Sequence, residues 1–337
     1  MQEDRRKRTR PGILLRMFLM FIVAMLTIRG GPAGAAGDAG SIWGADYFPN
    51  IPLVTHEGKS VRFFDDLIKD KVVVINFIFT RCPDVCPLET ARMREVQEIL
   101  GDRVGRDVFM YSISIDPEHD TPEVLKRYAE KFDVGPGWLF LTGKEADITL
   151  LRKKLGLYSE AERGGKLEAH TVSSIVGNQG TGRWMKMSPF VNPYVMATQI
   201  GGWLHNWKMP PTIEQDYASA PQVRTISKGE SLFRNRCSAC HTIGVKDASP
   251  SGKHTVGPDL AGVTKKRDPA WLTRFIATPD KMVAEKDPLA LELLALYDNV
   301  LMPNLRLNDV EIQAVLGYIE EESIRTELQR HPPEPRR

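Results

Sequence analysis

The stretch KVVVINFIFTRCPDVCPLE (residues 71–89) sets an apolar run directly before two cysteines. The run Lys71–Phe79 is rich in β-branched residues and is apolar on both faces apart from Asn76, as expected of a central strand that helices cover on both sides. A helix with an apolar stripe is predicted to follow, from Pro87 to about Leu100. A strand, a cysteine loop and a helix in this order indicate an α/β domain.

The sequence that follows keeps alternating between strands and helices. Predicted strands cover residues 108–115, 138–141 and 171–176, and predicted helices cover residues 145–155 and 193–204. A further helix is predicted to begin at Thr121-Pro122, because threonine suits the N-cap and proline the first helical position. This alternation predicts an α/β domain built on one mixed sheet.

After the proline-containing segment 209–221 the pattern changes to helices only, around a second cysteine motif. Cys237-Ser238-Ala239-Cys240-His241 is a C-x-x-C-H run, the attachment signal for a covalent haem c. Cys237 and Cys240 would form thioethers, and His241 would be the proximal iron ligand. Met302 is the candidate distal ligand, and Met282 is its rival. A structural zinc site would need a second pair of ligands, and no partner cysteine exists for His254.

This second half resembles a class I cytochrome c over residues 222–324. The resemblance is carried by Gly229, Phe233, Gly257-Pro258-Asp259-Leu260, Trp271-Leu272, Met302-Pro303 and Tyr318. It implies an all-α domain whose first and last helices cross at Gly229 and Phe233, against Val315 and Tyr318. It also implies that Pro258 helps to orient the proximal histidine.

Cys82 and Cys86 of the first motif are typical of a soft-metal or redox site. Cys86 lies at the start of the predicted helix, where the helix dipole favours a thiolate. Two thiolates select Cu(I), and an imidazole as third ligand would also allow Cu(II). His170, at the mouth of the strand 171–176, is the candidate for that imidazole. Its competitors are His56, His119 and His205. A purely structural disulfide is the alternative, although so short a loop gains little from a cross-link.

The first half resembles the Sco (SenC) family over about residues 49–204. The matching blocks are Asn76–Thr80, Cys82–Glu89, Ser114–Pro117, Asp120–Glu123 and Leu141–Gly143. The resemblance implies a thioredoxin-like fold, a copper ion held by Cys82, Cys86 and His170, and a role in assembling the CuA centre of cytochrome c oxidase. Family members often have an aspartate just before the histidine. Here Ala169 stands there, with Glu168 one position earlier.

The N-terminus and the composition place the chain outside the cytoplasm. A basic head at residues 5–10, the apolar run Met17–Ile28 and a small-residue segment at 33–36 read as an export signal, with a retained membrane anchor as the alternative. Both readings put the protein in the periplasm or on the outer face of a bacterial membrane. The formal net charge is only +2, so no nucleic-acid partner is predicted.

These features predict a chain of two domains with flanking segments. We expect a signal peptide or anchor at 1–35, a tether at 36–48, a Sco-like domain at 49–207, a linker at 208–221, a cytochrome c domain at 222–325 and a disordered tail at 326–337.

The leading functional hypothesis is an exported copper metallochaperone for the CuA subunit of cytochrome c oxidase, with one electron-transfer haem c. Such a protein is closer to a carrier than to a classical enzyme. The main alternative is a thiol-disulfide oxidoreductase that uses Cys82 and Cys86 with electrons from the haem or from other redox carriers. A plain electron carrier and a thioredoxin-like peroxidase are two weaker hypotheses. A peroxidase would want one reactive cysteine in a basic pocket.

Overall fold

The run after Lys71 forms the centre of a sheet in the first domain. The computed structural model describes residues 43–82, 85–159, 167, 170–205, 225–244 and 256–330. Strand β3 (Val72–Ile78) is buried along its whole length. Over the described residues the sheet has seven strands in the order β2-β1-β5-β4-β3-β6-β7. The other strands are β1 (Pro52–Thr55), β2 (Ser60–Arg62), β4 (Val108–Ser114), β5 (Trp138–Gly143), β6 (Ser174–Asn178) and β7 (Arg183–Met187).

The sheet is mixed, as predicted. Strands β3, β4 and β5 are parallel neighbours, whereas β6 runs antiparallel to β3 and β1 antiparallel to β5. In the β3–β6 register Ile75 lies opposite Ile175, and Val72 lies opposite Asn178. The start of β6 therefore lies at the edge of the sheet where β3 ends. That geometry brings the chain before β6 close to the cysteine loop that follows β3.

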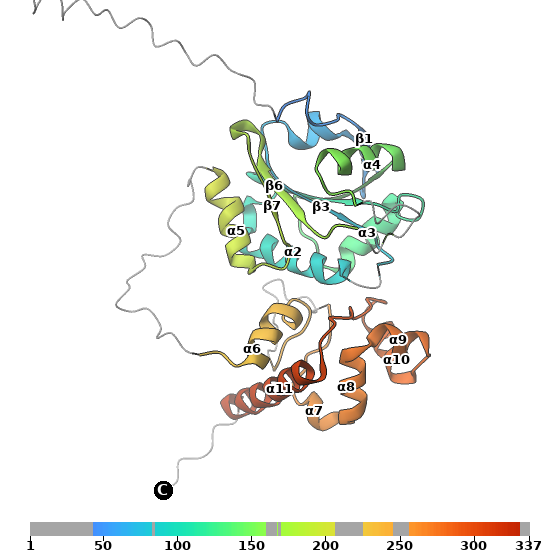
Figure 1. The fold of residues 1–337 in the computed structure, drawn as a ribbon, viewed down its shortest axis with the longest axis vertical. Coiled ribbons are helices and arrows are strands. Elements are labelled where there is room, and N and C mark those ends of the chain that lie inside the picture. Colours follow the sequence, from blue (N-terminus) through green and yellow to red (C-terminus); the bar gives the residue numbers. More distant parts are fainter. Residues whose placement is uncertain are drawn as a thin grey trace, which may run out of the picture. The chain divides into compact units, whose positions relative to one another are not determined.

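Helices cover both faces of this sheet. They are α2 (Cys86–Leu100), α3 (Pro122–Lys131), α4 (Glu145–Lys154) and α5 (Pro193–Gly201). Figure 1 shows α2, α3 and α5 on one side of the sheet and α4 on the other. The N-cap predicted for α3 is confirmed, because the Thr121 side chain accepts a hydrogen bond from the Val124 N–H and Pro122 occupies the first turn.

The ordered part of the first domain begins earlier than the sequence predicts. The tether was expected to extend to residue 48, yet the Phe48 side chain is only 1% exposed and belongs to the hydrophobic core. Its ring lies 4.8 Å from that of Trp184 on β7. Strands β1, β2 and β7 also had no prediction, since each is short and lies in the outer part of the sheet.

The second domain is helical. Its helices are α6 (Lys228–Leu232), α7 (Val263–Lys266), α8 (Pro269–Ala277), α9 (Pro279–Ala284), α10 (Pro288–Leu296) and α11 (Asp309–Arg330), with a π-helical turn, Phe233–Cys237, directly after α6. A Cβ atom on Gly229 would lie 2.0 Å from the Ala314 carbonyl oxygen. The rings of Phe233 and Tyr318 are 5.5 Å apart. The predicted close crossing of the first and last helices is therefore present, and only glycine fits at its centre.

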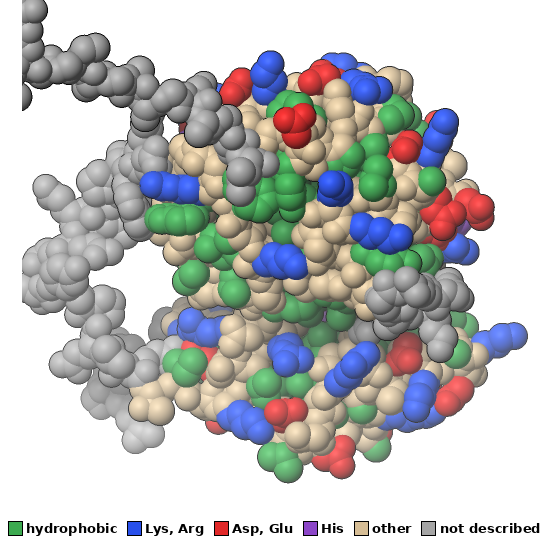
Figure 2. Space-filling model, turned by 45° about the horizontal axis from the view of Figure 1, so that its top comes forward, with side chains coloured by type: hydrophobic (Ala, Val, Ile, Leu, Met, Phe, Trp, Pro, Cys, Tyr) green, Lys and Arg blue, Asp and Glu red, His purple; other side chains and the backbone are tan. Residues whose placement is uncertain are grey.

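The last helix is longer than expected. The tail predicted to start at residue 326 is helical to Arg330, the final residue of α11. The export signal, most of the tether and the interdomain linker lie outside the described residues. Within the described ranges, no helix is both long enough and apolar enough to cross a membrane. On the face drawn in Figure 2, positive and negative side chains are interspersed.

Candidate metal and haem sites

The two cysteines of the first domain lie at the junction between β3 and α2. The Cys82 N–H donates to the Phe79 carbonyl at 3.2 Å, and Cys86 is the first residue of α2. Cys82 is 5% exposed and Cys86 is fully buried. Neither is joined in a disulfide in the described part of the chain, and their side chains form a hydrogen bond with each other. The motif therefore places two sulfur atoms side by side in a buried position.

The expectation of a stabilised thiolate at Cys86 is wrong for the metal-free protein. The pKa of Cys86 lies well above its ordinary value, first because of the hydrogen bond with Cys82 and next because of burial. The helix start does not outweigh these two effects. Cys86 therefore holds its proton more tightly than an ordinary thiol, and a metal ion would have to displace that proton on binding.

His170 lies beside the cysteines although it is 84 positions from Cys86 in the sequence. Its Nε2 atom is 4.0 Å from the Cys86 Sγ atom, and the side chain is buried. The Nδ1 atom is 2.8 Å from the Leu167 carbonyl oxygen. A carbonyl only accepts, so Nδ1 carries the proton and the lone pair of Nε2 faces the sulfur. The Leu167 carbonyl thus orients the ring, a task that a carboxylate performs for the histidine ligands of many metal sites.

The donor set fits a copper ion. Nitrogen and thiolate ligands lie about 2.1 and 2.3 Å from an ion such as Zn²⁺, so two such ligands of one ion are at most about 4.4 Å apart. The distance between Cys86 and His170 meets this limit. In the described part of the chain, no three His, Cys, Asp or Glu side chains are already arranged around one ion. Binding would therefore draw the three donors somewhat closer together.

The competing histidines lie elsewhere. His56 Nδ1 accepts a hydrogen bond from the Phe140 N–H at 3.1 Å. His119 is exposed in the loop before α3, and His205 ends the short helix Trp203–His205 after α5. Of these histidines, His170 is the one that contacts a motif cysteine.

Sequence reasoning missed a buried carboxyl group beside the cysteines. Glu89 on α2 is fully buried, and its Oε1 atom accepts a 2.9 Å hydrogen bond from the Asn76 amide. Among the described residues its Oε2 atom has no hydrogen-bond partner. Burial raises the pKa of Glu89 to about 7. The available signal was Asn76, the one polar residue of β3, because a buried amide needs a polar partner.

The haem motif of the second domain opens onto a cavity of about 450 Å³. Its wall is largely apolar and includes Cys237, Cys240, His241, Leu272, Phe275 and Met302. Apolar walls with two thiols and an imidazole on one side match the needs of a covalently held porphyrin. The sequence-predicted attachment residues are thus brought together at one cavity.

His241 is held in a defined orientation. Its Nδ1 atom donates to the Pro258 carbonyl at 2.9 Å, which leaves Nε2 free to bind iron. A Cβ atom on Gly257 would lie 2.6 Å from the His241 Cε1 atom. The segment Gly257–Pro258 therefore fixes the ring through a carbonyl and through the absence of a side chain.

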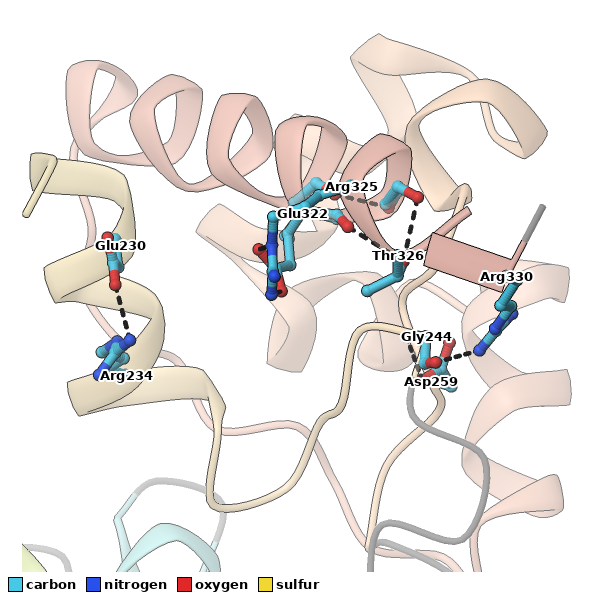
Figure 3. Close-up of polar contacts among 10 residues, drawn as sticks. Glu230, Arg234, Gly244, Asp259, Glu322, Arg325, Thr326 and Arg330 are labelled. Atoms are coloured by element: carbon cyan, nitrogen blue, oxygen red, sulfur yellow. Dashed lines mark hydrogen bonds and ion pairs between the residues drawn. The ribbon is translucent and has the colours of Figure 1, made fainter. Parts of the chain in front are cut away.

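The chain just after His241 is fastened by one carboxylate and by the end of α11. Asp259 accepts hydrogen bonds from the Thr242 hydroxyl at 2.6 Å and from the Gly244 N–H at 2.8 Å. The Arg330 guanidinium donates to the Gly244 carbonyl (Figure 3). The last turns of α11 are therefore part of the support for the haem motif.

The two candidate methionines occupy different environments. Met302 lies in the cavity wall. Met282 is fully buried and is absent from the described lining of the cavity. This arrangement favours Met302 as the distal ligand and leaves Met282 a packing role.

Comparison with protein-family models divides the chain at the same place as the two folds. The model described as SCO1/SenC matches residues 45–204, and the model described as Cytochrome c matches residues 226–323. The chain is a SCO1/SenC domain followed by a cytochrome c domain. Its first half has the mixed sheet and helices of the thioredoxin-like Sco fold, and its second half is helical.

Individual relatives match one domain at a time. Protein sco1 of Schizosaccharomyces pombe is 37% identical over 106 residues, which are 32% of this chain and 39% of that protein. The chain thus spans less than half the length of this curated relative. The structure of Bradyrhizobium japonicum ScoI with copper bound is 29% identical, with a TM-score of 0.38, over 44% of this chain and 94% of that one. The cytochrome c domain of the Pseudomonas putida pp3183 protein is 46% identical, with a TM-score of 0.28, over 32% of this chain and 99% of that one.

Proposed function

We propose that this protein is an exported copper-binding assembly factor for the CuA centre of cytochrome c oxidase that carries one covalently attached haem c. Membership of the SCO1/SenC and cytochrome c families supports the two cofactors. The observation that carries the copper assignment is that the His170 Nε2 atom lies 4.0 Å from the Cys86 Sγ atom, while the Cys86 side chain is hydrogen-bonded to that of Cys82.

The chain's own residues would hold each group in a definite way. Two soft sulfur donors retain Cu(I), and the imidazole of His170 adds the ligand that makes Cu(II) acceptable. Cys237 and Cys240 would anchor the porphyrin, with His241 and Met302 on the iron. A haem iron with these two ligands supplies one-electron transfer at a raised potential. Because copper also changes by one electron, the attached haem would set the oxidation state of the bound copper.

Metal and haem analysis of the purified full-length protein tests this proposal. We expect one copper ion and one haem in the wild type, with thiolate-to-Cu(II) charge-transfer bands. Those bands should disappear in Cys82→Ser and His170→Ala while the haem bands persist. His119→Ala is the matched control, because His119 is an exposed histidine of the same domain. Unchanged thiolate-to-Cu(II) charge-transfer bands in Cys82→Ser or His170→Ala would refute the copper site.

A second function is favoured by the hydrogen bond between the Cys82 and Cys86 side chains. Two hydrogen-bonded thiols are neighbours that can be oxidised to a disulfide, so the pair would serve as a thiol-disulfide oxidoreductase. A disulfide accepts two electrons and two protons to become two thiols, whereas one haem delivers one electron at a time. Replacement of His170 separates the two functions, because a reductase would keep its activity and a copper carrier would lose its ability to bind Cu(II).

A further inference from the structure

The loop that carries Cys82 is fastened by a buried carboxylate from a different part of the chain. Asp120, between β4 and α3, is fully buried. Its Oδ2 atom accepts a 3.1 Å hydrogen bond from the Thr80 N–H, and its Oδ1 atom accepts a 2.5 Å hydrogen bond from the Thr80 hydroxyl. A third donor, the Ser114 hydroxyl, lies 2.6 Å from Oδ2.

Strand pairing explains why these groups meet. Strands β3 and β4 are parallel, and Ile78 lies opposite Ser114 at their ends. Both chains leave the sheet at the same edge, one toward Cys82 and the other toward α3. Asp120 therefore joins the two outgoing loops directly beneath the cysteine motif.

The hydrogen bonds of Asp120 hold this loop more firmly than the nearby Arg81–Asp116 ion pair. Asp120 accepts three hydrogen bonds, and they are shielded from water because its side chain is fully buried. Arg81 donates two hydrogen bonds to Asp116, at 3.2 and 2.6 Å, but the Arg81 side chain is 59% exposed. The Asp116 side chain is 11% exposed, but an ion pair with one largely exposed partner still contributes little. Asp120 consequently contributes more than the Arg81–Asp116 pair to fixing the position of the loop.

We propose that Asp120 is a positioning residue for the copper ligand Cys82, acting through both donors of Thr80. Thr80 lies two residues before Cys82, so holding its N–H and its hydroxyl fixes the direction in which the chain enters the motif. Cys86 is fixed independently by α2. Asp120 thus sets the separation of the two sulfur atoms. This role rests on the proposed copper function of the pair.

The test compares Cu(I) retention against a chromophoric chelator in full-length Asp120→Asn, Thr80→Val and Thr80→Ser. The amide of Asn would direct an N–H at groups that are themselves donors. Loss of a supporting hydrogen bond of this kind typically weakens metal affinity about 10–100-fold, and we expect this for Asp120→Asn. Thr80→Val removes only the hydroxyl and should give a smaller loss, whereas Thr80→Ser should retain wild-type affinity. Asp116→Asn, which removes the exposed pair, should change affinity less than twofold.

A second readout needs no copper and separates the two proposals. The equilibrium between the Cys82–Cys86 disulfide and glutathione measures how well the two sulfurs are held together. Asp120→Asn and Thr80→Val should both make this disulfide harder to form, and the double variant should be no worse than Asp120→Asn alone. If the wild type binds no copper, the proposed function fails, while this equilibrium still tests the role of Asp120. An unchanged equilibrium in Asp120→Asn overturns that role. If Asp120→Asn does not fold, equal behaviour of Thr80→Val and Thr80→Ser overturns it.

Discussion

Asn76 and Glu89 form a buried hydrogen bond directly behind the cysteine pair, with the Asn76 amide donating to the Glu89 carboxyl at 2.9 Å. The side-chain amide oxygen of Asn76 accepts a hydrogen bond from the Ser112 hydroxyl at 2.7 Å. That hydroxyl in turn accepts one from the Trp138 indole N–H at 2.9 Å. In this row of hydrogen bonds each side chain donates to the next one, from Trp138 through Ser112 and Asn76 to the Glu89 carboxyl group. The row reaches from the middle of the sheet to α2 and ends beside the thiols.

We predict that Glu89 makes the stability of the first domain depend on pH. Its pKa is about 7 in the folded protein, against an ordinary value of 4.5. The folded state therefore binds the proton more tightly, and stability falls as pH rises from about 4.5 to about 7. A difference of this size corresponds to about 3 kcal/mol. Urea unfolding at pH 5 and pH 8 should show this loss in the wild type and a much smaller one in Glu89→Gln. Parallel pH profiles for the two proteins would contradict the prediction.

Alanine at two glycines of the second domain should have opposite effects on stability. At Gly229 the added Cβ would meet the Ala314 carbonyl oxygen at 2.0 Å, whereas at Gly317 it would meet nothing within 4 Å. Gly229→Ala should therefore lower the melting temperature by several degrees, because α6 and α11 must separate. Gly317→Ala should stabilise α11 by about 0.5–1 kcal/mol. Thermal unfolding of the haem-loaded protein measures both effects, and a tolerated Gly229→Ala would show that the crossing is not tight.

Replacing the two candidate methionines should separate ligation from packing. We expect Met302→Ala to lower the midpoint potential of the haem, because a thioether ligand raises it. Met282→Ala should leave the potential unchanged and lower stability by about 2–5 kcal/mol, as buried Met-to-Ala changes do. A potentiometric titration and a thermal melt of each variant provide the measurements. A potential shift in Met282→Ala alone would exchange the two assignments.

Alkylation of the metal-free protein should report the raised pKa of Cys86. Only the thiolate reacts, so the rate should be low at pH 7 and should still be rising at pH 9. The hydrogen bond with Cys82 is the largest cause of the raised pKa. Cys82→Ser should therefore bring the pH profile of Cys86 closer to that of an ordinary thiol. A plateau below pH 8 in the wild type would show that the helix start dominates after all.

The sequence predicted most of the central sheet and both cysteine motifs, because these depend on local pattern. The run after Lys71 is apolar on both faces, and the cap at Thr121 needs only the backbone N–H of Val124, three residues later. The missed features depend on tertiary contacts. Phe48 is ordered by the Trp184 ring, and the end of α11 is held where Arg330 reaches Gly244.

In the candidate copper site, too, the features that depend on local pattern were predicted, and several of those that depend on tertiary contacts were missed. The cysteine spacing alone indicated a soft-metal or redox site, and the proximity of His170 follows from the β3–β6 pairing. The pKa of Cys86 was predicted in the wrong direction, because burial and the neighbouring thiol cannot be read from the motif. Glu89 and Asp120 lie in the matching blocks, but their burial was not predicted, since a charged residue in a sequence is usually an exposed one.

The antiparallel placement of β6 beside β3 has a consequence for the order in which the protein matures. Cys86 and His170 are 84 positions apart, and contacts of such long range form late in folding. A chain whose β6 has not yet docked would still present two neighbouring sulfurs, enough for cuprous ion, but no imidazole for cupric ion. Binding of cupric ion as well as cuprous ion by the newly made protein would then indicate that β6 has docked on the sheet.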